Sequence, residues 1–300
     1  MTFELHHLQV DAAPPGAEDW AFTRHSRLVV RGGIRWHVQV TGSGPGLLLV
    51  HGTGASSHSF RELMPLLASR FTVVAPDLPG HALTEAPSRF APSLPVIAAA
   101  LEELLAALDI VPAVAVGHSA GAALIARMTL EHAIQPQLLV GLGAALTPFR
   151  GVARALFPST ALALSLASKL VPLRLGDESH VKRLLLRTGS SLDRSGVELY
   201  RRLSARPSHV AGTLAMMAHW DLEPLHEDLP TLRVPLLLLA GERDRAVSVA
   251  QQRDAASRVS GARVVVVEGA GHLLHEEQPG TVARLITGEV DAVLRAATRR

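Results

Sequence analysis

The chain has 300 residues, 48% of them hydrophobic, which suits one large α/β domain or two small domains with a full core. Its formal net charge is only +2 and no run of lysine and arginine is longer than a pair, so nucleic-acid binding has little support. The absence of cysteine excludes disulfides, thiolate metal sites and cysteine nucleophiles.

The sequence shows no segment typical of a signal peptide or a membrane span. Residues 1–25 lack a charged stretch followed by an apolar core, and they predict an irregular leader. The longest apolar tract, 159–173, is interrupted by Lys169 and Pro172 and is shorter than the ~20 residues of a transmembrane helix. We therefore expect no transmembrane segment and a cytoplasmic location.

The first half of the chain predicts a β-hairpin followed by alternating strands and helices. Alternating residues on both sides of a Gly-Gly pair predict the hairpin within 27–40. Continuous apolar runs predict strands buried on both faces, and apolar positions every three to four residues predict helices. The strands are expected within 46–54, 71–81, 112–119 and 136–146, and the helices within 59–70, 94–110 and 120–132.

The same alternation returns near the end of the chain. Strands are expected within 234–244 and 262–272, and helices within 248–260 and 277–297. Residues 147–228 do not continue this alternation of strands and helices: they contain helix-like stretches and no convincing buried strand. This pattern predicts an inserted helical lid. The predicted core is then 26–146 and 229–300. The fold class is α/β, with a mostly parallel, doubly wound sheet of about eight strands.

The pentapeptide GHSAG at 117–121 predicts a nucleophile, Ser119, on a sharp strand-to-helix turn. Such a turn has a strained backbone, and small residues two positions before and after the serine let it approach the next strand. The helix start directs free N–H groups toward a developing oxyanion, which makes the Ala120 N–H a candidate donor. The alternative is a tight turn with an idle serine.

Two further candidates lie where the last two predicted strands end, Asp244 and His272. The order Ser, Asp, His is one known arrangement of the catalytic triad. In that arrangement His272 takes the Ser119 proton and later gives it to the leaving group, while Asp244 holds the imidazole in the useful tautomer. Singly, each could be a loop carboxylate or a surface histidine.

The loop after the apolar run 46–50 is expected to supply the second oxyanion donor, the Thr53 N–H. Gly52 and Gly54 on either side of Thr53 let this loop approach the site closely. His51 in the same loop is interpreted as fixing its conformation. Asp77 is interpreted as a carboxylate that stabilises a turn. Asp221 could replace Asp244 as the acid of the triad, or it could have a structural role at the junction between the lid and the sheet.

Two further segments have residue types that could form a metal site or a substrate pocket. The HLLHEE segment at 272–277 superficially resembles a metal site. It has no established third ligand and His272 is already assigned to the triad, so we predict no metal and no cofactor. Met216, Met217 and Trp220 could line a large hydrophobic pocket, or they could pack a lid helix onto the body.

In order along the chain, the motifs HGTG, DLPGH, GHSAG, GERD and GAGHLLHEEQP resemble those of the α/β-hydrolase superfamily. The resemblance covers essentially the whole chain. It implies Ser119 as nucleophile, Asp244 as acid and His272 as base, with Thr53 and Ala120 as oxyanion donors. One departure is Ala82, where many relatives have glycine, and it is expected to narrow the pocket mouth.

Several longer segments are similar to a narrower family of accessory proteins associated with magnesium chelatase in bacteriochlorophyll biosynthesis. The segments RTGSSLD at 187–193 and MMAHWDLEPL at 216–225 carry this resemblance most specifically. It implies an association with the chelatase that inserts magnesium into protoporphyrin. It does not say which reaction this hydrolase would catalyse.

These observations leave three functional hypotheses. The first is a cofactor-independent serine hydrolase that acts on an ester or related acyl bond of a large apolar substrate, such as a tetrapyrrole or an isoprenoid-bearing intermediate. Trp220 and the methionines would contact that substrate. The second is an accessory protein that binds porphyrin or docks on chelatase subunits without catalysis. The third keeps the enzyme but changes its reaction to carbon–carbon cleavage or a lyase step.

Overall fold

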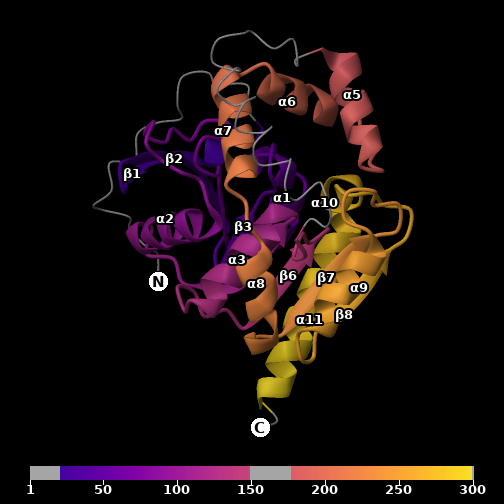
Figure 1. Cartoon of the computed structure of the whole chain (residues 1–300). Helices are drawn as coiled ribbons and strands as arrows, with labels where there is room; N and C mark the ends of the chain where they lie inside the picture. Colours follow the sequence, from indigo (N-terminus) through magenta and orange to yellow (C-terminus); the bar gives the residue numbers. More distant parts are fainter. Residues whose placement is uncertain (1–20, 149–176, 299–300) are drawn as a thin grey trace.

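The computed structural model describes residues 21–148 and 177–298, which form a layered α/β structure around one sheet (Figure 1). Eight strands follow the order β1-β2-β4-β3-β5-β6-β7-β8. The hairpin strands pair antiparallel and β2 pairs antiparallel with β4, whereas all pairings from β4 to β8 are parallel. The predicted mostly parallel sheet is therefore confirmed. The strands are β1 Ser26–Arg31, β2 Ile34–Thr41, β3 Gly46–Val50, β4 Thr72–Pro76, β5 Pro112–His118, β6 Leu138–Leu142, β7 Leu236–Gly241 and β8 Arg263–Val267.

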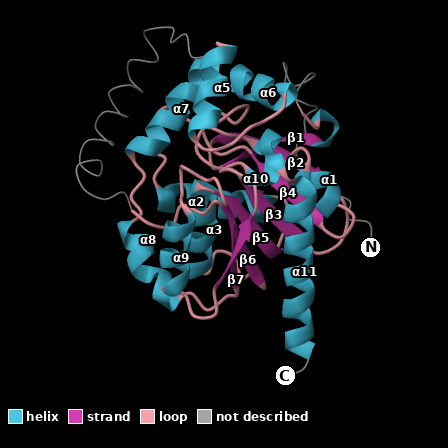
Figure 2. Ribbon diagram, turned by 90° about the vertical axis from the view of Figure 1, so that its right-hand side faces the viewer, coloured by secondary structure: helices cyan, strands magenta, loops and turns pink. Residues whose placement is uncertain are grey.

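Helices cover both faces of this sheet (Figure 2). They are α1 Leu63–Leu67, α2 Leu94–Ala107, α3 Ala120–Leu130, α9 Val249–Ser257, α10 Leu274–Glu277 and α11 Pro279–Thr298, with short 3-10 turns η1 Thr23–His25, η2 Ser57–Phe60 and η3 Leu229–Thr231. The helix expected within 59–70 is instead split into η2 and α1. Pro65 has no N–H to donate to the preceding turn, which prevents one continuous helix across this segment.

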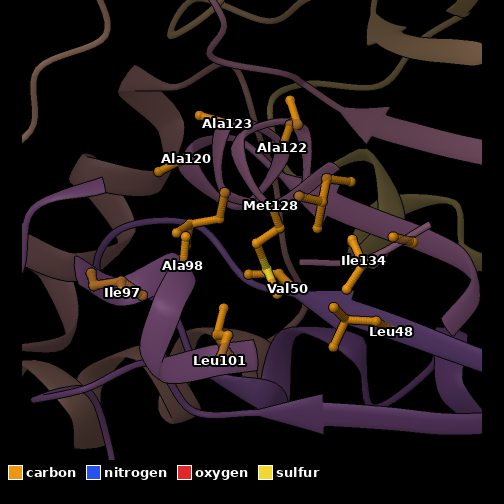
Figure 3. Close-up of a cluster of buried hydrophobic side chains, with 14 of the residues drawn as sticks. Leu48, Val50, Ile97, Ala98, Leu101, Ala120, Ala122, Ala123, Met128 and Ile134 are labelled. Carbon is orange, nitrogen blue, oxygen red and sulfur yellow. The ribbon is translucent and has the colours of Figure 1, made fainter. Parts of the chain in front are cut away.

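Each face of the sheet buries its own apolar cluster, because the central strands are apolar on both sides. On one face, Leu48 and Val50 of β3 pack with Ile97 and Leu101 of α2 and with Met128 of α3 (Figure 3). On the other face, residues of α1 and α11 cover the alternate side chains of the same strands. The sheet is thus held from both sides, and its strand ends are fixed in space.

Four helices follow one another in the described residues between β6 and β7: α5 Glu178–Arg187, α6 Arg194–Ser204, α7 Pro207–Ala218 and α8 Glu223–Asp228. Asp177 and Asp193 cap α5 and α6 through their side chains. Figure 1 shows α5, α6 and α7 together at one edge of the sheet, while α8 lies beside α3. The apolar tract 159–173 and residues 1–20 of the expected leader lie outside the described residues. No helix within the described ranges is long and apolar enough to cross a membrane.

Helix α3 makes its closest approach to the sheet at Gly121. A Cβ atom placed on Gly121 would lie 2.1 Å from the Val50 carbonyl oxygen, and one on Gly117 would lie 2.4 Å from the Ala122 nitrogen. Side chains at these positions would push α3 away from β3 and β5. The small residues expected around Ser119 are therefore required by backbone packing.

We expect Gly121→Ala to lower the free energy of unfolding by about 3 kcal/mol or more, because a buried backbone clash cannot relax without moving α3. Gly288→Ala is the matched control. Gly288 lies in α11 with open space around its Cβ position, and alanine there should stabilise the protein by about 0.5–1 kcal/mol. Urea unfolding of both variants measures the two changes. Equal stability of the Gly121 variant and the wild type would contradict this account.

Candidate active site

Ser119 occupies a strained turn between β5 and α3. Its backbone has φ 51° and ψ −115°, in the positive-φ region that non-glycine residues rarely adopt. The Ser119 N–H donates to the Leu142 carbonyl at 2.9 Å, and the Ser119 carbonyl accepts from the Ala122 and Ala145 N–H groups, each at 3.1 Å. These bonds hold the strained turn in place at the carboxyl edge of the sheet.

The loop after β3 approaches Ser119 closely. A Cβ atom on Gly52 would lie 2.9 Å from the Cβ atom of Ser119. His51 fixes this loop, because its Nδ1–H donates to the Gly52 carbonyl at 2.8 Å and its Nε2 accepts from the Leu78 N–H at 2.9 Å. Thr53, Ser119 and Ala120 consequently line one cavity, which places the two predicted oxyanion donors beside the predicted nucleophile.

Asp244 and His272 form a buried pair. His272 Nδ1 and Asp244 Oδ2 lie 2.8 Å apart, and each residue is only 7% exposed. The second oxygen, Oδ1, accepts from the N–H groups of Ala246 at 2.8 Å and Val247 at 2.9 Å. A carboxylate held in this way accepts the Nδ1 proton of the imidazole, which leaves Nε2 as the basic nitrogen.

The pair lies next to the Ser119 turn. The His118 ring centroid is 4.7 Å from that of His272, and His118 Nε2–H donates to the His272 carbonyl at 3.1 Å. A Cβ atom on Gly143, directly after Leu142, would lie 2.9 Å from His272 Nδ1. Ser119, Asp244 and His272 thus follow the carboxyl ends of β5, β7 and β8, at the edge of the sheet where reactive groups of open α/β sheets meet.

The cavity that opens above Ser119 has a volume of about 630 Å³ and a mainly apolar lining. The lining includes Met217 near the end of α7, Trp220 and Leu222 between α7 and α8, and Val247 before α9. Met216 is not among the lining residues: it is fully buried, and its sulfur lies 3.9 Å from the Thr53 hydroxyl. Met216 therefore fits the alternative expectation, in which it packs the helix onto the body, since neighbouring residues of one helix point in different directions.

The remaining carboxylates considered from the sequence have structural partners. Burial by itself would raise the pKa of Asp77, but the adjacent His37, with its Nδ1 2.8 Å from Asp77 Oδ2, holds that pKa well below its usual range. Asp77 also accepts from the Ser57 N–H at 2.7 Å, which agrees with a turn-stabilising role. Asp221 accepts from the Glu223 N–H at 3.0 Å at the start of α8.

Sequence reasoning missed His209 on α7, which joins this helix to the loops after β3 and β4. Its Nδ1 accepts from the Ala82 N–H at 3.0 Å, and its Nε2–H donates to the Gly54 carbonyl at 3.3 Å. Burial lowers the pKa of His209 to about 4, so the ring is neutral at pH 7 and can serve both roles. Ala82 itself, with φ 46°, lines a separate cavity and does not line that of Ser119.

His275 and Glu276, two other members of the HLLHEE segment considered for a metal, are both buried. His275 is fully buried, with its ring centroid 4.5 Å from that of His118. Glu276 pairs with Arg61 and accepts from the Tyr200 hydroxyl at 2.7 Å. Burial raises the pKa of Glu276 to about 7, while Arg61 and Tyr200 oppose the rise. No group of three or more potential metal ligands occurs among the described residues.

Comparisons with known proteins identify the family of this chain. The profile of the alpha/beta hydrolase fold family matches residues 45–279. The chain therefore belongs to the alpha/beta hydrolase fold family. It is also 42% identical over 250 residues to the magnesium-chelatase 30 kDa subunit of Rhodobacter capsulatus, an alignment that covers 82% of this chain and 87% of that protein.

Solved structures share the same architecture. An alpha/beta hydrolase fold protein from Burkholderia ambifaria superposes with a TM-score of 0.75 at 22% identity, covering 93% of this chain and 99% of that one. An esterase from Exiguobacterium antarcticum gives a TM-score of 0.72 at 18% identity, covering 86% and 96% of the two chains. At these identities the likeness establishes the fold.

We expect His275→Phe to increase the free energy of unfolding by about 2 kcal/mol more at pH 5 than at pH 8. Burial lowers the pKa of His275 to about 3 from an ordinary value of 6.5. Between pH 6.5 and pH 3, His275 binds a proton in the unfolded chain but not in the folded protein. His275 therefore lowers the free energy of unfolding as the pH falls through this range. Urea unfolding at the two pH values measures the difference.

The exposed residue His180 provides the control for this prediction. The variant His180→Phe should change the free energy of unfolding by similar amounts at pH 5 and pH 8. If His275→Phe shows the same small pH dependence as His180→Phe, His275 does not stay neutral in the folded protein.

Proposed function

We propose that the protein is a serine hydrolase in which Ser119, His272 and Asp244 form a catalytic triad. His272 Nε2 takes the Ser119 hydroxyl proton while Oγ attacks the acyl carbon of an ester or related bond. The Thr53 and Ala120 N–H groups stabilise the resulting oxyanion. His272 then protonates the departing alcohol, and a water molecule, activated in the same way, releases the acid and restores Ser119.

The observation that carries this proposal is the buried Asp244–His272 pair beside a serine on a strained turn. The two oxygens of Asp244 are satisfied by the His272 ring and by backbone N–H groups, so the imidazole is held in one tautomer. Ser119 and both oxyanion donors line the same cavity. A serine with no catalytic role would not require this combination.

The cavity favours a large apolar substrate. Its volume of about 630 Å³ lies within the ~300–1,000 Å³ of small-molecule sites, and Trp220 and Met217 offer a flat ring and a soft thioether. The relative from Rhodobacter capsulatus is named as a subunit of magnesium chelatase. We therefore infer a role at the magnesium-chelatase step of bacteriochlorophyll biosynthesis, with a tetrapyrrole ester or an isoprenoid-bearing intermediate as substrate.

The first test is labelling of the purified protein with a fluorophosphonate, which forms a stable adduct with an activated serine. We expect the wild type to be labelled and Ser119→Ala to show no adduct. His272→Ala and Asp244→Asn should label about 10³-fold more slowly or worse, because the proton acceptor or its orientation is lost. Intact-mass spectrometry measures the adduct.

Asp221→Asn is the matched control, since Asp221 is the other acid considered from the sequence and is exposed. Its labelling rate should equal that of the wild type. Loss of labelling in Asp221→Asn with retention in Asp244→Asn would reverse the assignment of the acid. A folded wild type that is never labelled would contradict the serine-hydrolase proposal.

The second test concerns the substrate. Trp220→Ala should lower kcat/KM for long-chain p-nitrophenyl esters about ten-fold or more relative to short-chain esters, because a large apolar contact with the acyl group is lost. Leu294→Ala, at an exposed position of α11, should leave this ratio unchanged. If Trp220→Ala leaves the ratio of kcat/KM for long-chain and short-chain esters unchanged, Trp220 does not contact the acyl group.

The name of the Rhodobacter relative also favours a second candidate, a non-catalytic protein that binds porphyrin or docks on chelatase subunits. Expressing this chain in a Rhodobacter capsulatus strain that lacks the relative separates the candidates. Rescue of bacteriochlorophyll by the wild type but not by Ser119→Ala favours catalysis, and rescue by both favours docking. Product analysis with candidate substrates distinguishes acyl hydrolysis from carbon–carbon cleavage.

A further inference from the structure

The segment Thr188–Ser190, between α5 and α6, lies against the loops that carry both Asp244 and His272. The Thr188 carbonyl accepts from the Arg245 N–H at 3.0 Å, and the Ser190 hydroxyl oxygen accepts from the Leu273 N–H at 2.8 Å. Arg245 directly follows Asp244, and Leu273 directly follows His272. Ser190 is fully buried, so this second bond has no competition from water.

Gly189 contacts the residues that precede the same two side chains. A Cβ atom on Gly189 would lie 1.9 Å from the Arg243 carbonyl oxygen, and one on Gly271 would lie 2.3 Å from the Gly189 carbonyl oxygen. Gly189 has φ 86°, which favours glycine at this position. The three-residue segment therefore contacts the backbone on both sides of Asp244 and on both sides of His272.

The segment is itself held firmly by the end of α5. The Gly189 N–H donates to the Leu186 carbonyl at 3.1 Å, and the Ser190 N–H donates to the Leu185 carbonyl at 3.3 Å. Leu185 packs in a buried cluster that includes Leu273. A movement of α5 relative to the sheet would thus be transmitted to the backbone beside His272.

We propose that Thr188–Ser190 is a positioning segment that maintains the hydrogen bond between His272 and Asp244. The acid and the base lie on separate loops after β7 and β8, and this segment joins the two loops by backbone contacts. Displacement of a catalytic group by about 1 Å can cost ~10²-fold in rate, so such a connection has a functional consequence. The inference rests on the proposed catalytic role of the pair and adds residues that do not touch substrate.

The test is Ser190→Ala, which removes the acceptor for the Leu273 N–H with almost no change in volume. The first readout is the downfield proton NMR signal of the His272 Nδ1–H, which is assigned by its loss in His272→Gln and requires no substrate. We expect this signal to broaden or move upfield in Ser190→Ala. The second readout is the rate of fluorophosphonate labelling, which should fall about ten-fold.

Ser195→Ala is the matched control, because Ser195 is an exposed serine near the start of α6 whose hydroxyl donates only to Asp193 among the described residues. It should retain the NMR signal and the labelling rate of the wild type. Circular dichroism and melting temperature establish that each variant is folded. If Ser190→Ala does not fold, Ser190→Cys, which keeps a weak sulfur acceptor of similar size, takes its place and should show the same changes in smaller degree.

The outcomes separate this inference from the proposed function. A wild-type NMR signal and labelling rate in a folded Ser190→Ala variant would overturn the positioning role while leaving the serine hydrolase intact. A wild type that is not labelled would contradict the hydrolase. The NMR signal would still decide whether Ser190 maintains the His272–Asp244 bond.

Discussion

The close approach of the β5–α3 turn to the end of β3 is the constraint on which the rest of the site depends. It is possible only because Gly52, Gly117 and Gly121 have no Cβ atoms to meet the opposing backbone. A positive-φ serine costs of order 1–3 kcal/mol, and the buried packing of α3 against the sheet offsets that cost. Once Ser119 is held at this edge, the ends of β6, β7 and β8 bring Gly143, the Asp244 loop and the His272 loop beside it in the order of the sheet.

The electrostatic surroundings of the site follow from burial. Burial lowers the pKa of His118 and of His275, so the two rings that lie near His272 are neutral at pH 7. Neutral neighbours do not repel a positive charge that develops on His272 when it takes a proton, whereas charged neighbours would. Arg61, whose positive charge also acts on His275, forms an ion pair with Glu276. Buried histidines therefore surround the proposed acid–base pair with neutral rings.

The helices between β6 and β7 divide their contacts between the two halves of the site. Helix α7 contacts the proposed oxyanion side, where His209 bonds Gly54 and the Met216 sulfur lies near the Thr53 hydroxyl. The α5–α6 segment meets the acid–base side, where Ser190 bonds Leu273 and Tyr200 of α6 bonds Glu276. The same region supplies Met217, Trp220 and Leu222 to the cavity. Because these helices supply lining residues, they are where the substrate preference of the proposed hydrolase is expected to arise.

By itself the sequence determined the sheet, its flanking helices and the candidate triad, because each depends on a local pattern. Apolar runs mark buried strands, GHSAG marks the turn, and Asp244 and His272 follow strand ends that a parallel sheet must place at one edge. The helix expected within 59–70 was wrong, because its apolar spacing outweighed the signal of Pro65. Tertiary structure alone decided that Met217 lines the cavity while Met216 is buried, because the direction of α7 relative to the sheet selects between adjacent residues. It also decided the contacts of His209 and Ser190, whose bonded partners lie 155 and 83 residues away in sequence, beyond the reach of any local pattern.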